Sequence, residues 1–440
     1  MRTAPGAVPV LGHVLRLWRD PWQFLRSLSG TCDIAVIRLG PRRAYLLVDP
    51  DLVRDVLVTR NHAFGKGALF EKGKAVFGES ILSSEGEFHL RQRRLMQPAF
   101  HRARLASYTE IIRGVVEEIS DSWRDGETIA VDREMLKISA GSVTRCLFSA
   151  HDQAIQAASV IVRALPVLAE GTIKRGLAPT DLPYRIPLPA NRRYDAAVRA
   201  FHTTIAQVIA DYRSKDEDRG DLLSMLLAAR DEATGEGMTD QQVHDETAGI
   251  LSAGSETTAQ ALAWALHVLG TMPEVERRVR TELVEVLDGR AIRFEDIARL
   301  EYSGRLVAEV LRFYSPAFMF TRSPHAEVRI GGHRIPAGSI VLYSPYLLQH
   351  DPAVFADPEC FDPDRWRSPS LDMCRSQMPF GAGPHQCIGE SFATTEMTIA
   401  IAAIAARWTL GPASGHKVSP KAFVTCTPDR LFMTPISIRK

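Results

Sequence analysis

The spacing of hydrophobic and polar residues predicts a chain built mostly from helices. Alternation typical of strands is rarer, and it predicts a hairpin over 34–48 that turns at Gly40, with further short strands near 326–343 and 423–437. Hydrophobic residues recur every three to four positions, which is typical of one buried helix face, in the segments 101–119, 131–149, 155–170, 193–214, 239–269, 274–286, 300–314 and 388–407. We therefore expect a mainly α fold with a minor β portion.

The length and charge of the chain narrow the classes of function. Its 440 residues allow two or three domains of ordinary size, but no repeat, low-complexity linker or charge block divides them, so we predict one domain over 1–440. The formal net charge is +1 and no long basic run occurs, so we expect no nucleic-acid partner. Prolines and charged residues interrupt the apolar residues near the N-terminus. We therefore expect no membrane span, no signal peptide and a cytoplasmic location.

The six cysteines lack the C-x-x-C spacing of zinc sites and redox dithiols, so any chemistry falls to a single cysteine. The segment 380–390 reads FGAGPHQCIGE. Gly381 and Gly383 permit a tight turn, Pro384 stiffens it, and Cys387 stands at the predicted start of an apolar helix. A helix N-terminus favours a thiolate, and a thiolate on such a loop suits axial ligation of haem iron. The alternative is a free cysteine buried ahead of a core helix.

The residues Phe380, Gly383, His385, Cys387 and Gly389 stand together at fixed spacing. Their pattern resembles the haem-binding signature of the cytochrome P450 superfamily, F-x-x-G-x-[R/H]-x-C-x-G. The resemblance implies a P450 fold with haem b between the long central helix and the helix of the cysteine loop. It also implies that Cys387 holds the iron and that His385, where arginine is commoner, makes a titratable contact to a haem propionate.

Gly381 belongs to the same haem-binding loop, and further residues match the family's propionate contacts. His89 and Arg93 lie four apart in GEFHLRQRR, as in the family's H-x-x-x-R, and Arg322 follows the helix near 300–314. A propionate is an anion, and charge-assisted donors suit it. Each of these residues taken alone would more often lie on a solvated helix face.

The predicted helix 239–269 begins with a possible capping box, Thr239 to Gln242. Its middle contains Gly249 and Gly254, which each cost about 1 kcal/mol against alanine in a helix interior. A weak middle needs a reason, such as a ligand close to the backbone or a local opening of the helix. Close packing of another helix is the simpler alternative.

The same helix matches the family pattern A-G-x-[D/E]-T through Ala253, Gly254, Glu256 and Thr257. In the family this pattern lies over the distal face of the haem. The resemblance implies that Thr257 donates a hydrogen bond to bound oxygen and that Glu256 relays protons from bulk water. The alternative is that Thr257 bonds the carbonyl of Ala253 while Glu256 takes part in an unrelated salt bridge.

Glu309 and Arg312 share a helix face in AEVLRF, between apolar neighbours that suggest burial. A buried pair needs additional partners to offset desolvation. The resemblance supplies one, an arginine in a later meander, and Arg365 of FDPDRW is the candidate. It implies a structural network of these three residues.

The resemblance also implies a substrate pocket lined by four regions of almost wholly apolar residues. They are Leu69, Phe70, Val76, Phe77, Ile81, Leu82, Ile250, Ala253, Ala317, Phe318, Met319, Phe423 and Val424. Their character predicts a multi-ring or isoprenoid substrate, although several could belong to the core. Residues 93–101, 187–195 and 334–338 are most similar to bacterial terpenoid-oxidising members.

These features together predict a monooxygenase that inserts one atom of O2 into an apolar small molecule, with a terpenoid as the preferred class. No flavin or iron–sulfur segment is visible, so electrons must come from a separate ferredoxin and ferredoxin reductase. Arginines near 91–104 suggest a docking face for such an acidic carrier. The alternatives are a peroxide-driven haem-thiolate peroxygenase and a non-catalytic haem sensor. Glu256 and Thr257 argue against both, because only cleavage of O2 needs delivered protons.

Overall fold

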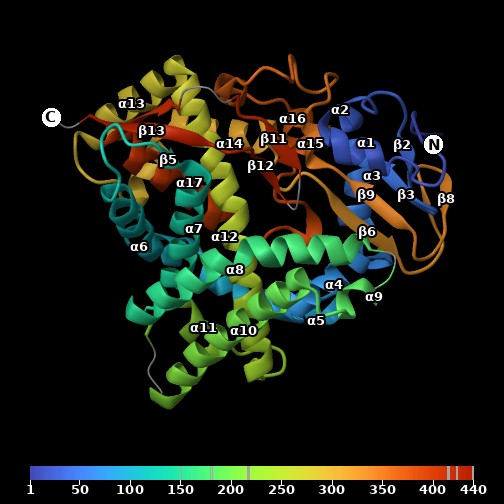
Figure 1. Ribbon diagram of the computed structural model, residues 1–440, viewed down its shortest axis with the longest axis horizontal. Helices are drawn as coiled ribbons and strands as arrows, with labels where there is room; N and C mark the ends of the chain where they lie inside the picture. Colours follow the sequence, from blue (N-terminus) through green and yellow to red (C-terminus); the bar gives the residue numbers. More distant parts are fainter. Residues whose placement is uncertain are drawn as a thin grey trace. The chain divides into compact units, whose positions relative to one another are not determined.

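A computed structural model describes residues 1–149, 151–178, 180, 182–215, 219–413, 417–422 and 425–438 (Figure 1). The chain forms two compact units. The first comprises Met1–Glu71 and Ala308–Cys387, and the second comprises Lys72–Val307 and Ile388–Lys440. The single domain over 1–440 stays a prediction.

The first unit contains a six-stranded sheet in the order β1-β2-β3-β9-β6-β4. The predicted hairpin is confirmed, because two antiparallel strands, β2 and β3, turn at Gly40 with a φ of 62°. The strands predicted near 326–343 are also present as β7, β8 and β9. The bounds are β1 Arg2–Thr3, β2 Ile34–Leu39, β3 Arg42–Leu47, β4 Phe64–Gly65, β6 Phe320–Pro324, β7 Val328–Ile330, β8 His333–Ile335 and β9 Ile340–Tyr343.

Short helices complete the first unit. They include a π-helical turn, η1, that continues α3. They also include the 3₁₀ turns η5 and η6, which precede Cys387 in the chain. The bounds are α1 Val14–Arg19, α2 Pro21–Arg26, α3 Pro50–Arg54, η1 Asp55–Thr59, η2 Asn61–Ala63, α15 Pro345–Gln349, η5 Pro363–Arg367, α16 Leu371–Ser376 and η6 Gly383–His385. Two helices, α4 (Ala68–Phe77) and α14 (Glu301–Phe313), are divided between the units.

The second unit is mainly helical and is organised around α12 (Asp240–Thr271), which contacts α7, α8, α10, α11, α13 and α17. The other bounds are α5 Gly86–Met96, η3 Gln97–Phe100, α6 Arg102–Asp121, α7 Val131–Leu147, α8 His151–Leu177, α9 Leu182–Arg185, α10 Pro189–Lys215, α11 Leu222–Ala228, α13 Pro273–Leu287, η4 Phe294–Arg299 and α17 Glu390–Ala405. Its strands are β5 Ile129–Ala130, β10 Trp408–Pro412, β11 Pro420–Ala422, β12 Cys426–Pro428 and β13 Phe432–Ser437. The mainly α fold with a minor β portion is thus confirmed.

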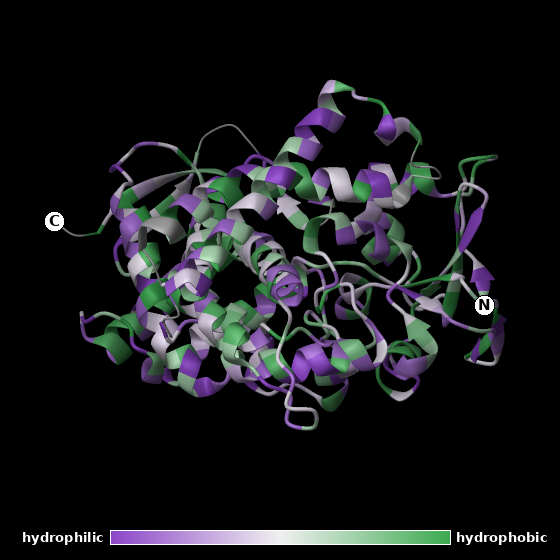
Figure 2. Cartoon of the chain, turned by 90° about the horizontal axis from the view of Figure 1, so that it is seen from below, coloured by the Kyte–Doolittle hydropathy of each residue, from purple (hydrophilic) through white to green (hydrophobic). Residues whose placement is uncertain are grey.

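The long helix α12 is capped at its start and buried over much of its length. Its capping box is confirmed, since Thr239 accepts from the backbone N–H of Gln242 and the Gln242 side chain accepts from that of Thr239. Every residue from Thr258 to Leu266 is buried, as expected for a helix surrounded by others. Hydrophobic and hydrophilic positions alternate along many of the helices (Figure 2). The helix α12 is therefore the core of the second unit.

Helix α8 is the described helix whose length and composition would allow a membrane span, over Ala154–Gly176. It contacts α7 and α10 inside the second unit, and Ala164, Leu165 and Leu168 are buried. Packing against these two helices accounts for the buried residues.

Candidate haem-thiolate site

The loop before α17 exposes the side chain of Cys387 and fixes its backbone. The Cys387 N–H donates to the carbonyl of Phe380 at 2.9 Å. Gly381 and Gly383 both have a φ of 72°, in the left-handed region that favours glycine. A Cβ at Gly383 would collide with the carbonyl oxygen of Leu57, so η1 also requires glycine there. The result is a closed loop with an accessible thiol.

The structure corrects one prediction about this loop. Helix α17 begins at Glu390, with Gly389 as its N-cap, so Cys387 lies before the helix and not at its first turn. The reason is local, because the 3₁₀ turn η6 and the bond to Phe380 hold the intervening residues in a non-helical loop. Backbone N–H groups of a loop can still favour a thiolate, but the helix N-terminus contributes less than expected.

Two other cysteines are unsuited to act as thiolates. Burial raises the pKa of the Cys146 thiol well above its usual range, and the neighbouring Glu396 carboxyl adds to this effect. Burial likewise raises the pKa of the Cys426 thiol. Neutral buried thiols are poor metal ligands. Among the exposed cysteines Cys360, Cys374 and Cys387, Cys387 is the one that follows the glycine turn described above.

The middle of α12 places Glu256 and Thr257 in different surroundings. The Thr257 hydroxyl donates to the carbonyl of Ala253 at 2.7 Å, as the simpler local alternative expects. Glu256 instead accepts from the hydroxyl of Thr425 at 3.2 Å. Burial raises the pKa of the Glu256 carboxyl to about 6, against a small lowering by Thr425. Glu256 can therefore exchange a proton near neutral pH.

The weak middle of α12 has a packing reason at each glycine. A Cβ at Gly254 would lie 3.0 Å from a methyl group of Val143 on α7. A Cβ at Gly249 would lie 2.7 Å from the hydroxyl of Ser80. Close packing of another helix, which was the simpler alternative, is thus observed at Gly254, whereas Gly249 packs against the loop between α4 and α5.

The predicted propionate contacts lie in both units. Arg322 on β6 is only 7% exposed, and no carboxylate of the described residues pairs with it. Its guanidinium donates to the carbonyl of Thr321 at 2.8 Å and lies over the Tyr343 ring. His89 and Arg93 lie one turn apart on α5, with His89 buried within 3.4 Å of the Ser84 hydroxyl. A buried arginine without an acidic partner is costly, so Arg322 fits an anionic ligand. His385 lies partly buried in η6.

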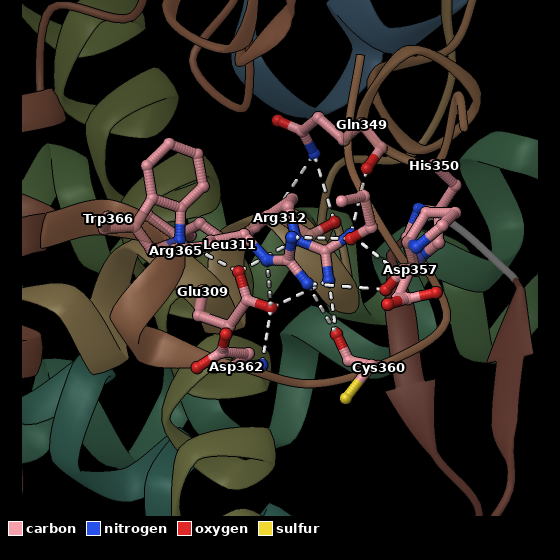
Figure 3. Close-up of polar contacts among 12 residues, drawn as sticks. Glu309, Leu311, Arg312, Gln349, His350, Asp357, Cys360, Asp362, Arg365 and Trp366 are labelled. Carbon is pink, nitrogen blue, oxygen red and sulfur yellow. Dashed lines mark hydrogen bonds and ion pairs between the residues drawn. The ribbon is translucent and has the colours of Figure 1, made fainter. Parts of the chain in front are cut away.

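The structure brings Glu309, Arg312 and Arg365 together, as predicted (Figure 3). Glu309 and Arg312 are both fully buried and form a two-pronged ion pair, with N···O distances of 2.7 and 2.8 Å. The Nε of Arg365 donates to Glu309 at 3.1 Å. A pair of this geometry can offset its desolvation only with further partners.

Those further partners come mostly from residues that the sequence did not identify. The indole N–H of Trp366 donates to Glu309 at 2.8 Å. Arg312 donates to the backbone carbonyls of Gln349, Pro358 and Cys360 at 2.9–3.2 Å (Figure 3). Trp366 directly follows Arg365 and needs an acceptor when buried, so the sequence contained a signal for it. The sequence contained no signal for the three backbone carbonyls that accept from Arg312.

The predicted pocket residues are spread over several elements. Phe318 packs edge-on against Trp22, with ring centroids 5.0 Å apart, and so belongs to the core of the first unit. The Phe77 ring folds over Gly73 of its own helix. Phe423 and Val424 lie outside the described residues. The remaining residues divide by burial: Val76 and Ile81 are buried, and Leu69, Phe70, Leu82, Ile250, Ala253, Ala317 and Met319 are partly exposed.

A separate cavity of about 250 Å³ lies in the second unit. It is lined by residues that include Thr128, His267, Arg430 and Phe432, and by none of the predicted site residues. It offers no cysteine to an iron atom, so it is not a candidate for the haem site.

A family model described as Cytochrome P450 matches residues 3–434. The chain belongs to the cytochrome P450 family. Three Streptomyces relatives cover nearly all of it. Cyclooctatin synthase of Streptomyces melanosporofaciens is 44% identical and covers 98% of this chain and 95% of its own. Cyclooctat-9-en-7-ol 5-monooxygenase of the same organism is 42% identical, covering 94% and 90%. Pentalenene oxygenase of Streptomyces avermitilis is 36% identical, covering 96% and 94%.

These findings confirm the predicted resemblance to the superfamily and to its bacterial terpenoid-oxidising members. This P450 is therefore a haem-dependent monooxygenase, and as a member of the family it binds haem b through a cysteine thiolate. The exposed thiol of Cys387 fits such a group, and so does the buried Arg322, which pairs with no carboxylate of the described residues.

Proposed function

We propose that this P450 oxygenates a cyclic terpenoid, with Cys387 as the iron ligand and a separate ferredoxin system as the electron source. The observation that carries the assignment of the ligand is the accessible thiol on a closed glycine loop directly before α17. When bound, haem supplies the activation of O2 that lets one oxygen atom enter the substrate. The residues of the chain supply binding, orientation and protons.

The choice of substrate class rests on the apolar character of the predicted pocket and on the names of the relatives. Leu82, Ile250 and Met319 offer apolar, partly exposed side chains. Two relatives are named for acting on cyclooctat-9-en-7-ol and pentalenene. An apolar ring system gains free energy from burial against such residues, about 25 cal/mol for each Å² removed from water.

If haem binds as proposed, its two propionate groups need partners that donate hydrogen bonds or carry positive charge. Arg322 would hold one propionate, and His89, Arg93 and His385 are the further candidates. Phe380 and Gly381 would lie beside the macrocycle, on the loop that Cys387 closes. Arg322 has the strongest case, because a buried guanidinium with no carboxylate partner gains most from an anion.

Proton delivery is assigned to α12. The Thr257 hydroxyl already donates to Ala253, so its oxygen can accept a hydrogen bond from an ordered water, and rotation frees its proton for a bound ligand. Glu256 has a pKa of about 6 and can pass protons to that water. Thr257 is then the inner group and Glu256 the outer group of a proton relay.

The test uses purified holoenzyme with a ferredoxin, its reductase and NADPH under ¹⁸O2. The probes are a cyclic terpene alcohol and, as a matched apolar competitor, a long-chain fatty acid. We expect one ¹⁸O atom in the terpenoid product and little product from the fatty acid. Cys387→Ser should lose the strongly red-shifted Soret band of the ferrous–CO complex, while Cys374→Ser, at an exposed cysteine, should keep it.

Contrary outcomes point to the alternatives. Product that forms with added peroxide but disappears when catalase is added would indicate a peroxygenase. Tight haem binding without product from either substrate would indicate a sensor. A red-shifted band retained in Cys387→Ser would overturn the assignment of the ligand. The cytoplasmic location belongs to this proposal too, and cell fractionation tests it.

A further inference from the structure

The loop Gly78–Ser84, between α4 and α5, lies against the N-terminal half of α12 within the second unit. Two consecutive carboxylates of α12 accept hydrogen bonds from its backbone. Asp245 accepts from the N–H of Glu79 at 2.8 Å, and Glu246 accepts from the N–H of Ile81 at 2.8 Å. Charge-assisted hydrogen bonds are stronger and more directional than neutral ones. The loop is therefore tied to the helix at two alternate residues.

Glu246 makes a third connection. It is fully buried, and its other carboxylate oxygen accepts from the side-chain amide of Gln92 at 3.1 Å. Gln92 is itself fully buried on α5, between Arg91 and Arg93. One carboxylate thus joins the loop, α5 and α12. A buried carboxylate cannot exchange these donors for bulk water without large cost, so the three segments are held in one relative position.

Close packing reinforces the hydrogen bonds. A Cβ at Gly249 would lie 2.7 Å from the hydroxyl oxygen of Ser80 and 2.8 Å from its Cβ. Gly78 has a φ of 54°, and a Cβ there would collide with the carboxylate of Asp245. The loop therefore rests directly on the helix backbone, and any side chain larger than hydrogen at Gly249 must push Ser80 away.

Asp245 and Glu246 are not equivalent. Asp245 also accepts from the side chain of Gln241 at 2.7 Å and lies 3.3 Å from His244, and its carboxylate keeps some exposure to solvent. Asp245 therefore keeps partners on its own helix if one hydrogen bond is lost. Glu246 is fully buried, so bulk water cannot replace a hydrogen bond that its second oxygen makes. The connection through Glu246 is therefore the more sensitive one.

We propose that Glu246 is a positioning residue that sets the regioselectivity of this P450 by fixing the loop 78–84 against α12. This inference rests on the proposed function, in which the loop contributes Ile81 and Leu82 to the substrate pocket and α12 contributes Ile250 and Ala253. Ile250 lies one helical turn beyond Glu246. A shift of the loop by a few tenths of an ångström changes which carbon of a rigid ring system is presented for oxygenation.

The test compares Glu246→Gln with a matched control. Glu282 on α13 has the same chemistry elsewhere in the second unit, since its carboxylate accepts from the backbone N–H groups of Tyr302 and Ser303. Both substitutions remove one acceptor from a glutamate that holds backbone amides. We expect both to lower the melting temperature and to keep the red-shifted ferrous–CO band. Only Glu246→Gln should change the ratio of positional products from one cyclic terpenoid, by at least about threefold.

A second variant separates the position of the loop from the loss of the carboxylate. Gly249→Ala displaces Ser80 and leaves both carboxylates in place. It should change the product ratio although Glu246 keeps both of its oxygens. A wild-type ratio in Gly249→Ala and Glu246→Gln, with haem bound, would overturn the proposal. If Glu246→Gln fails to fold, the result for Gly249→Ala decides.

Hydrogen exchange gives a readout that does not depend on the substrate. In the holoenzyme without substrate, Glu246→Gln should speed exchange of the amides over 79–84 by about tenfold or more. The reason is that the Ile81 N–H loses its carboxylate acceptor, since glutamine offers only one neutral oxygen. Glu282→Gln should leave these amides unchanged. Faster exchange together with no terpenoid product would retain the anchoring role and reject the proposed function. Unchanged exchange would reject the role of Glu246.

Discussion

At the scale of single residues, Glu256 and Thr257 are neighbours in the chain that meet different partners. Thr257 bonds Ala253 of its own helix, whereas Glu256 reaches Thr425 from a distant segment. We expect Thr257→Ala to bind substrate and consume NADPH but to release several times more hydrogen peroxide and less product. The measurement is the ratio of product to NADPH consumed, and a wild-type ratio would leave Thr257 with a structural role only.

Glu256 should determine a pH dependence. Its pKa is raised to about 6 by burial, so the protonated form, which donates, accumulates as pH falls through 6. If proton delivery limits turnover, oxygen consumption should rise over that range. Glu256→Gln should remove the rise, slow turnover by roughly tenfold or more, and raise the solvent isotope effect. A rise that persists in the variant would place the titrating group elsewhere.

Glu396 on α17 is a second carboxyl that titrates out of its usual range. It is fully buried, and burial raises its pKa to about 8, while the hydroxyls of Ser139 and Ser142 lower it only in part. Neither hydroxyl makes a well-formed hydrogen bond to the carboxyl in the described structure. Glu396 is therefore mostly a neutral acid at pH 7. Its signal in the sequence was a single acidic residue among apolar and threonine residues in the helix interior.

The sign of the effect on stability follows from the direction of that pKa. A carboxyl with a folded pKa above its ordinary value of 4.5 destabilises the folded state increasingly as pH rises from 4.5 to about 8. Glu396→Gln should therefore stabilise the enzyme by about 3 kcal/mol at pH 7, at about 1.4 kcal/mol for each pH unit. Thermal unfolding at pH 5 and pH 8 checks this, since the gain should nearly vanish at pH 5. An equal gain at both pH values would contradict it.

At the scale of elements, the network of Glu309 joins α14 to η5. Removing its carboxylate leaves Arg312 buried without its main partner, which costs about 3–5 kcal/mol. We expect Glu309→Ala to lose that much stability and much of its haem. Trp366→Phe removes one hydrogen bond and should cost about 1–2 kcal/mol.

An exposed pair in the same unit provides the control for this prediction. Glu327, directly before β7, and Arg334 on β8 form a two-pronged pair, with half or more of each side chain exposed. Glu327→Ala should change stability by less than about 1 kcal/mol. Urea unfolding of the holoenzymes measures both variants. Equal losses for Glu327→Ala and Glu309→Ala would show that burial does not determine the cost.

At the scale of the whole molecule, the net charge is only +1, but arginines are concentrated locally on α5 and α6. The structure shows that several are already engaged. Arg94 pairs with Asp231 at 3.1 Å, Arg91 donates to the carbonyl of Gly237, and Arg104 donates to that of Gly220. Arg102 is exposed and lies over the Phe294 ring. A docking face for an acidic carrier would therefore rest mainly on Arg102.

If this face steers the carrier, reduction by ferredoxin should slow several-fold between low salt and about 0.5 M salt, where charges more than about 4 Å apart are screened. Arg102→Ala should slow reduction at low salt and leave it unchanged at high salt. Arg124→Ala, at an 83% exposed arginine near the end of α6, is the matched control and should have no effect. Stopped-flow reduction rates that stay flat across ionic strength would indicate an ordinary solvated face.

The sequence by itself determined the features that depend on near neighbours. The capping box of Thr239, the hairpin at Gly40, the Glu309–Arg312 pair and the closed loop of Cys387 were all predicted. Each is set by residues within a few positions of one another, where spacing alone brings side chain and backbone together. The family signature then identified the cofactor, because its five positions also lie within one short segment.

Only the tertiary structure decided features that join distant segments. Trp366 donates a hydrogen bond to Glu309, which lies 57 positions away in the sequence. Ile81 donates one to Glu246, which lies 165 positions away. The burial of Glu396, which raises its pKa, likewise depends on distant segments, among them α7 with Ser139 and Ser142. Periodicity tells which face of a helix is buried but not what covers it. Hydrogen-bond partners and desolvation depend on that cover, so these properties exist only once the chain has folded.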